Sequence, residues 1–212
     1  IEQIPEFIQD AFVSVEDRRF YNHAGFDPIR IIKARKNNVM SGGVVEGGST
    51  ITQQYAKNLF LTNEQTISRK IQEFFYAIRL EMQYSKAEIL EGYLNTLYYG
   101  HGIYGVRNAA KFFFDKELAD LDIAQTAMLI GIPNGPSLYS PYLHPDYAKA
   151  RQELILSVFL QRDLISEDEY QAAMKEQLTY AAHEDDQNVY GNEEYFITVV
   201  LEELSQKNLL DK

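Results

Sequence analysis

Helix-start sequences recur along this chain of 212 residues, and apolar residues at helical spacing follow most of them. A Ser or Thr with Glu or Gln three positions later can satisfy the free N–H groups of a helix start. Such pairs include Thr50 with Gln53, Ser85 with Glu88, and Ser166 with Glu169. Asp27 followed by Pro28 is a further start signal, an N-cap before a proline at the first helical position. These signals predict an all-α fold.

The apolar spacing predicts where the helices lie. We expect helices over residues 4–19, 29–36, 50–59, 66–84, 86–97, 107–114, 120–130 and 146–164, with another after Ser166. Asp120 is the expected cap of the helix that ends at Gly131. Glycine-rich loops are expected at 37–48 and 98–105, and an extended segment at 134–145. We expect one domain over residues 1–180, and a linker or the start of a following domain over residues 181–212.

Composition limits the classes of function. The net charge of −11 argues against general nucleic-acid binding. Residues 18–70 nevertheless hold nine Lys and Arg against three Asp and Glu, a net of +6, whereas residues 163–212 hold three against thirteen, a net of −10. A basic region within an acidic protein suggests an anionic ligand there, although the two regions could simply attract each other. The absence of cysteine excludes disulfides and thiol chemistry.

The segment from Val15 to Asp27 carries candidate catalytic residues. Glu16, Phe20 and His23 would share one face of a continuous helix, and Asp17 follows the first of them. An acid beside an aromatic ring and a histidine can form a catalytic edge. The alternative is a surface helix end with solvated charges.

Two further segments suit an anion. Ser49 and Thr50 open a helix that also carries Gln54 and Lys57, and the start of a helix favours a phosphate group. Arg69 and Lys70 precede Glu73 by four and three positions. In a helix these spacings would bring both cations next to the carboxylate. The alternatives are a capped amphipathic helix with a solvated lysine, and an ordinary i,i+4 Arg–Glu pair. In the second helix, the apolar stripe comprises Ile67, Ile71, Phe74, Phe75, Ile78 and Met82.

Four segments, taken together, resemble the glycosyltransferase domain of class A penicillin-binding proteins and monofunctional peptidoglycan glycosyltransferases. They are E-D-R-R-F-Y-N-H-A-G-F-D (16–27), G-G-S-T-I-T-Q-Q-Y-A-K-N (47–58), R-K-I-Q-E (69–73) and K-A-E-I-L-E-G-Y-L-N (86–95). The resemblance covers about residues 4–178. The family's aromatic-Phe-Gly-Lys run is Phe113-Phe114-Asp115-Lys116 here, a departure that bears on a local turn.

The resemblance implies a lysozyme-like large lobe and a smaller, membrane-facing lobe near residues 28–48. It implies an enzyme that polymerises lipid II on the extracytoplasmic face of the bacterial membrane and that binds phosphoglycolipids of the moenomycin type. Glu16 would be the general base, and Glu73 would be a second catalytic carboxylate. Lys57, Arg69, Lys70 and, by resemblance, Arg151 would bind the pyrophosphate, which Mg²⁺ or Mn²⁺ would bridge. Residues 195–204 resemble the approach to a transpeptidase domain.

Two other functions remain open from the sequence. A lysozyme-like hydrolase or lytic enzyme would also use two carboxylates, such as Glu16 and Glu73, but would have no need of the cations between them. An inactive scaffold that only holds lipid-linked glycan would not need either carboxylate.

Overall fold

The computed structural model describes residues 1–32, 47–61 and 66–183. The chain forms two compact units, Ile1–Thr179 and Tyr180–Lys212, and residues 180–183 are the described part of the second. The predicted nature of the second unit, including the resemblance of residues 195–204 to the approach to a transpeptidase, therefore stays a prediction. The glycine-rich segment 37–46 also lies outside the described residues.

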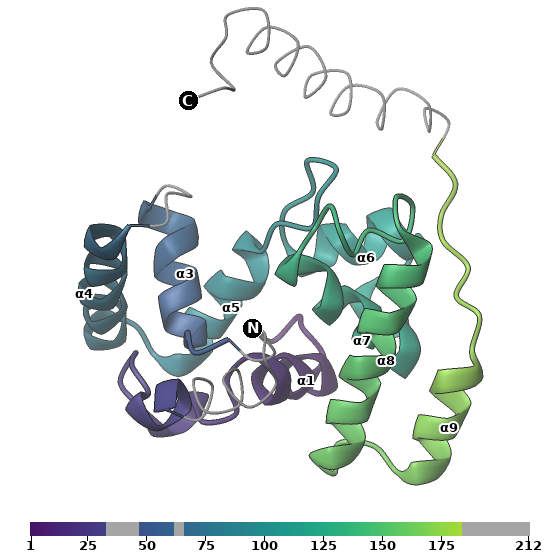
Figure 1. Ribbon diagram of the computed structural model, residues 1–212, viewed down its shortest axis with the longest axis horizontal. Helices are drawn as coiled ribbons and strands as arrows, with labels where there is room; N and C mark the ends of the chain where they lie inside the picture. The colour runs from purple at the N-terminus through teal and green to yellow at the C-terminus, as the bar shows by residue number, and fades with distance from the viewer. Residues whose placement is uncertain (33–46, 62–65, 184–212) are drawn as a thin grey trace, which may run out of the picture. The chain divides into compact units, whose positions relative to one another are not determined.

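The first unit is built from helices, which confirms the all-α prediction for the described residues (Figure 1). Within those ranges there is no β-strand, and Tyr98 and Tyr104 form an isolated antiparallel bridge. The elements are α1 (Glu6–Glu16), η1 (Phe20–Asn22), α3 (Ile51–Phe60), α4 (Ile67–Gln83), α5 (Lys86–Thr96), α6 (Val106–Phe114), η2 (Leu118–Asp120), α7 (Ile123–Gly131), η3 (Ile132–Asn134), α8 (Pro145–Gln161) and α9 (Glu167–Lys175). A further helix begins at Pro28, and its described part runs to residue 32.

Helix α7 is the centre of the core, because every residue from Ala124 to Gly131 is buried. α8 lies beside it (Figure 1), and α1, α6 and α9 also pack against it. A helix whose residues are buried on all sides must be enclosed by others. A second group of helices forms where α3 packs against both α4 and α5. The candidate site residues come from both groups.

The predicted helix starts are confirmed with one correction. Reciprocal capping boxes begin α3, α5 and α9 as expected, and the Asp27 side chain accepts hydrogen bonds from the backbone N–H groups of Ile29 and Arg30. The cap of α7, however, is Asp122 rather than Asp120, because Asp122 forms the box with Gln125. Asp120 instead ends the short helix η2.

Two other expectations about secondary structure are wrong. The helix expected over residues 4–19 ends at Glu16, since Asp17 leaves the helical region of backbone space at φ −161° and ψ 74°. Glu16, Phe20 and His23 therefore do not share a helix face. Residues 135–143 form turns rather than an extended segment, and a short helix, η3, precedes them.

The apolar stripe of α4 is mostly exposed to solvent. Ile67, Ile71, Phe75 and Met82 are each more than half exposed, whereas the buried positions of this helix are Glu73, Ala77 and Leu80. Glu73 is buried because it lies on the side of α4 that packs against α3. The apolar spacing of α4 does not indicate this side. Among the helices of the described ranges, none has the length and apolar character needed to cross a bilayer.

Candidate active site

Glu16 lies at the C-terminal end of α1 and is almost completely buried, with 9% of its surface exposed. Its Oε2 accepts a hydrogen bond of 3.0 Å from the side-chain amide of Gln54, on α3. Its Oε1 accepts one of 2.9 Å from the side-chain amide of Asn134, in η3. Both donors are neutral amides, so they fix the carboxylate in place without pairing it with a positive charge.

Two buried tyrosines border the same carboxylate. Burial raises the pKa of Tyr93 and Tyr99 well above the ordinary value, and the negative charge of Glu16 raises both further. The positive charge of Arg30 acts against this shift at Tyr93. The Tyr93 hydroxyl donates to Gln54, at 3.3 Å, and so helps to orient the amide that holds Glu16.

Asp17 connects the end of α1 to the start of α3. It is fully buried, and its Oδ2 accepts hydrogen bonds from His23 Nε2, at 2.9 Å, and from the backbone N–H of Ile51, at 3.0 Å. The Gly25 N–H donates to His23 Nδ1, so the proton of the imidazole that faces Asp17 is on Nε2. A carboxylate at a helix N-terminus is electrostatically favourable.

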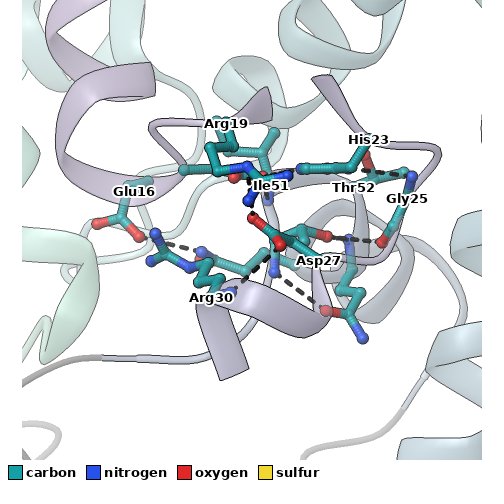
Figure 2. A network of polar contacts seen from close by, with 12 residues as sticks. Glu16, Arg19, His23, Gly25, Asp27, Arg30, Ile51 and Thr52 are labelled. Atoms are coloured by element: carbon teal, nitrogen blue, oxygen red, sulfur yellow. Dashed lines mark hydrogen bonds and ion pairs between the residues drawn. The ribbon is translucent and has the colours of Figure 1, made fainter. Parts of the chain in front are cut away.

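A second buried carboxylate, Asp27, lies in the middle of the same network (Figure 2). Besides capping the helix at residue 28, it lies 3.5 Å from Arg19 Nε. Thr50 closes the network, because its hydroxyl donates to the Gly25 carbonyl at 2.8 Å and accepts from the Gln53 N–H. The segment 17–27 is therefore held to the start of α3 at several points.

Gly25 permits this arrangement, and Gly25→Ala is expected to disrupt it. Gly25 has φ +82°, and a Cβ there would lie 3.0 Å from backbone atoms of Ala77. The strain of positive φ and the overpacking should together lower the free energy of unfolding by about 2–4 kcal/mol. Urea unfolding of both proteins measures the difference. A loss below about 0.5 kcal/mol would show that the segment adapts easily.

A cluster of two cations around Glu73 forms the second part of the site. Glu73 is 2% exposed; Arg69 Nη1 donates to its Oε2 at 3.0 Å, and Lys70 Nζ donates to its Oε1. Lys70 Nζ also donates to Ser49 Oγ at 2.8 Å, so the cluster reaches the residue before the cap of α3. The segment from Ser49 to Gln54 thus contacts both this cluster and Glu16.

The remaining predicted residues take different places. Asp17, Phe20 and Thr50 are fully buried and contact protein groups, so we expect them to shape the site rather than touch a ligand. Lys57 is half-buried on α3, one turn after Gln54. The Arg151 guanidinium lies over the Tyr139 ring at 5.5 Å.

Arg151 packs against the end of α7. A Cβ on Gly131 would lie 2.9 Å from Arg151 Cγ, so the absence of a side chain at Gly131 leaves room for the aliphatic part of Arg151. Gly131 lies three residues before Asn134. In the part of the chain that the structure describes, the Nε–H groups of Arg30, Arg69 and Arg151 are buried and have no hydrogen-bond partner. Buried donors without a partner are unusual in a protein.

Sequence reasoning missed two site residues. The sequence predicts an extended segment at Asn134, and the contact of this residue with Glu16 spans 118 positions, so no local pattern reveals it. Lys86 opens the K-A-E-I-L-E-G-Y-L-N motif, whose spacing does not indicate a role for it; its Nζ donates to the His23 carbonyl and to Glu81. The available signal is the pair of prolines and the glycine in I-P-N-G-P (132–136), because these residues favour a tight turn around Asn134.

The described residues do not offer a metal site. Within residues 1–32, 47–61 and 66–183, no group of three His, Asp or Glu side chains could hold an ion. Glu73 meets two cations instead of other carboxylates. The expectation that Mg²⁺ or Mn²⁺ bridges a pyrophosphate stays a prediction.

Comparison with known proteins identifies relatives of the whole region that carries the site. The sequence model of the family described as Transglycosylase matches residues 1–159. The chain is 48% identical to penicillin-binding protein 1F of Bacillus subtilis over 169 residues, which is 80% of this chain and 24% of that protein. It is 42% identical to penicillin-binding protein 1A of Aquifex aeolicus over 200 residues, 94% of this chain and 27% of that protein.

Among solved structures, the crystal structure of penicillin-binding protein 1A from Haemophilus influenzae matches at 28% identity and a TM-score of 0.45. That match covers 63% of this chain and 17% of the other. The chain therefore spans about a quarter, or less, of the length of these proteins.

Proposed function

Since the chain belongs to the transglycosylase family, as its sequence motifs predicted, we propose that it is a peptidoglycan glycosyltransferase. It joins lipid II to a growing glycan strand through a β-1,4 bond, with inversion at the anomeric carbon, and releases undecaprenyl pyrophosphate. The observation that carries the proposal is the buried Glu16 carboxylate held by two neutral amides, together with the two-cation cluster at Glu73.

Glu16 suits the role of general base. The 4-hydroxyl of the acceptor sugar must lose a proton as it attacks the anomeric carbon, and a positioned carboxylate can accept that proton. Hydrogen bonds from Gln54 and Asn134 fix the carboxylate in one orientation. Both donors are uncharged amides, so neither forms an ion pair with the carboxylate, and each oxygen retains a further lone pair that can accept a proton.

The cations suit the leaving group. A departing pyrophosphate needs charge neutralisation more than protonation. Arg69 and Lys70 gather at one buried carboxylate, so the cluster keeps a net positive charge. An arginine guanidinium donates charge-assisted hydrogen bonds to phosphate oxygens, a role that suits Arg69 and Arg151. Lys57, one turn beyond Gln54, would add a further positive charge.

The two alternatives are less well supported by the geometry. A hydrolase of the lysozyme type would need a second carboxyl group as acid or nucleophile, but both oxygens of Glu73 are bound to cations. A scaffold without activity would not need the buried and precisely held Glu16. Release of undecaprenyl pyrophosphate from lipid II tests the proposal: the purified chain should produce it in multiple turnovers, and a scaffold or a hydrolase should not.

A lipid-linked substrate also requires contact with the membrane surface. Ile29, Ile31 and Ile32 are exposed beside Arg30, a combination that suits an anionic bilayer. The membrane-facing lobe expected near residues 28–48 also includes Val39, Met40, Val44 and Val45, which lie outside the described residues. We propose that this edge of the molecule, near residues 28–48, meets the extracytoplasmic face of the bacterial membrane.

Replacing Ile29, Ile31 and Ile32 together with serine is expected to weaken binding to anionic liposomes by at least about tenfold, because apolar side chains are lost from the contact. Liposome co-sedimentation at low ionic strength measures the change. The control is the double variant Leu138→Ser, Leu154→Ser, which removes exposed leucines elsewhere. Equal binding by the triple variant and the unaltered chain would exclude this edge as the contact.

A further inference from the structure

Lys86 is the first residue of α5, directly after the cap Ser85. A positive charge at the start of a helix opposes the helix dipole, so the local helix does not explain a lysine there. Its side chain is 22% exposed, and it turns toward the segment 20–23 rather than into solvent. Contacts outside α5 must therefore account for the position.

The ammonium group of Lys86 meets three groups from two other segments. Its Nζ donates to the His23 carbonyl at 2.7 Å and to Glu81 Oε1 at 2.6 Å, and it lies 4.4 Å from the centre of the Phe20 ring. Phe20 and Glu81 are both buried or nearly so. Ion pairs and cation–π contacts of this kind are worth more when shielded from water than at the surface.

One branch of these contacts leads to Glu16 along the chain. Lys86 fixes the backbone of His23, and the His23 ring donates to Asp17. Asp17 directly follows Glu16, at the point where α1 stops. Movement of the segment 20–23 would therefore shift the end of α1 that carries the carboxylate.

The other branch leads to Glu16 through space. The oxygen of Glu81 that pairs with Lys86 also accepts a hydrogen bond from the Thr52 hydroxyl, in the first turn of α3. Two residues further along α3, Gln54 donates to Glu16. Lys86 thus supports both the backbone beside Glu16 and the helix that carries one of its two amide donors.

We propose that Lys86 is a positioning residue for Glu16, a role that rests on the proposed function and adds a residue to it. Lys86 does not contact Glu16 and takes no part in proton transfer. It holds segment 20–23 and the first turn of α3 in the arrangement that aims the carboxylate.

The test uses Lys86→Met, which keeps the length of the side chain but removes its charge and donors. We expect kcat for lipid II polymerisation to fall about 10- to 100-fold, the effect of a displacement near 1 Å, with KM changed less than about threefold. Lys86→Arg should restore most of kcat, since a cation returns. The control is Lys111→Met, which removes a lysine that pairs with Asp115 on the exposed side of α6.

Amide hydrogen exchange gives a readout that needs no turnover. Residues 17–25 and 51–54 should exchange faster in Lys86→Met than in Lys111→Met, because their support is lost. If Lys86→Met does not fold, Glu81→Gln takes its place and should show the same changes to a smaller extent. A wild-type kcat and unchanged exchange in the folded variant would overturn the proposal. Failure of the unaltered chain to turn over lipid II would instead overturn the proposed function.

Discussion

Replacing Glu16 with glutamine is expected to lower lipid II polymerisation by about 10²- to 10⁴-fold, the usual contribution of a general base. Glutamine keeps the shape of the side chain but cannot accept the proton of the attacking hydroxyl. One oxygen of Glu16 becomes an NH₂ group that faces an amide donor, either Gln54 or Asn134. A loss of stability of about 1–2 kcal/mol should accompany the loss of activity, because a buried donor then lacks its acceptor.

Activity is measured as undecaprenyl pyrophosphate released per enzyme, and folding as the far-ultraviolet circular dichroism of the helices. Glu153→Gln is the matched control, since this glutamate lies on α8 with 40% of its side chain exposed. It should retain full activity. Wild-type turnover by folded Glu16→Gln would remove Glu16 from the role of base.

Replacing Arg69 with alanine is expected to raise the Kd for ligands that carry a phosphate or pyrophosphate by about 10- to 100-fold, because charge-assisted hydrogen bonds are lost. Lys57→Ala should weaken the same ligands. Glu73 would keep its contact with Lys70 in the Arg69 variant, so the fold should persist. Phosphoglycolipids of the moenomycin type and lipid II should both be affected, since each presents an anionic phosphate group.

Isothermal titration at low ionic strength measures the affinities, and the difference between variants should shrink as salt is added, because screening weakens exposed charges. Arg107→Ala serves as the control: this arginine is exposed and contacts Gln3 and Glu117. Affinities that remain unchanged in both the Arg69 and the Lys57 variants would exclude this cluster as the phosphate site.

Local signals in the sequence predicted most of the helices. A capping box is complete within four residues, so Thr50, Ser85 and Ser166 could be recognised as helix starts without any tertiary information. The wrong prediction of Asp120 as a cap also concerns a local signal. Asp120 and Asp122 stand two positions apart, and only Asp122 forms a capping box with Gln125.

Tertiary contacts determine the end of α1 and the buried side of α4, which the apolar spacing does not predict. The apolar spacing predicts that the first helix continues to Arg19, but α1 ends at Glu16. Asp17 leaves the helical conformation and accepts hydrogen bonds from His23 and from the start of α3. The apolar spacing of α4 likewise could not show that the polar side with Glu73 is buried. Helix propensity and apolar spacing are weak predictors of structure where such long-range contacts override them.

The candidate site was therefore predictable in its residue types and not in its geometry. The sequence motifs supplied Glu16, Gln54, Arg69, Lys70 and Glu73, and the structure gives each a contact in one of two adjoining clusters. Asn134 and the network of Lys86 depend on contacts between residues far apart in the chain. Such contacts leave no short pattern in the sequence.

The most direct measurement incubates the purified chain with radiolabelled lipid II and separates the products by length on a gel. Glycan strands of many disaccharides are expected from the unaltered chain, and none from Glu16→Gln. Shortening of preformed glycan without any growth from lipid II would contradict the proposed glycosyltransferase activity, and so would unchanged lipid II in the presence of a folded chain.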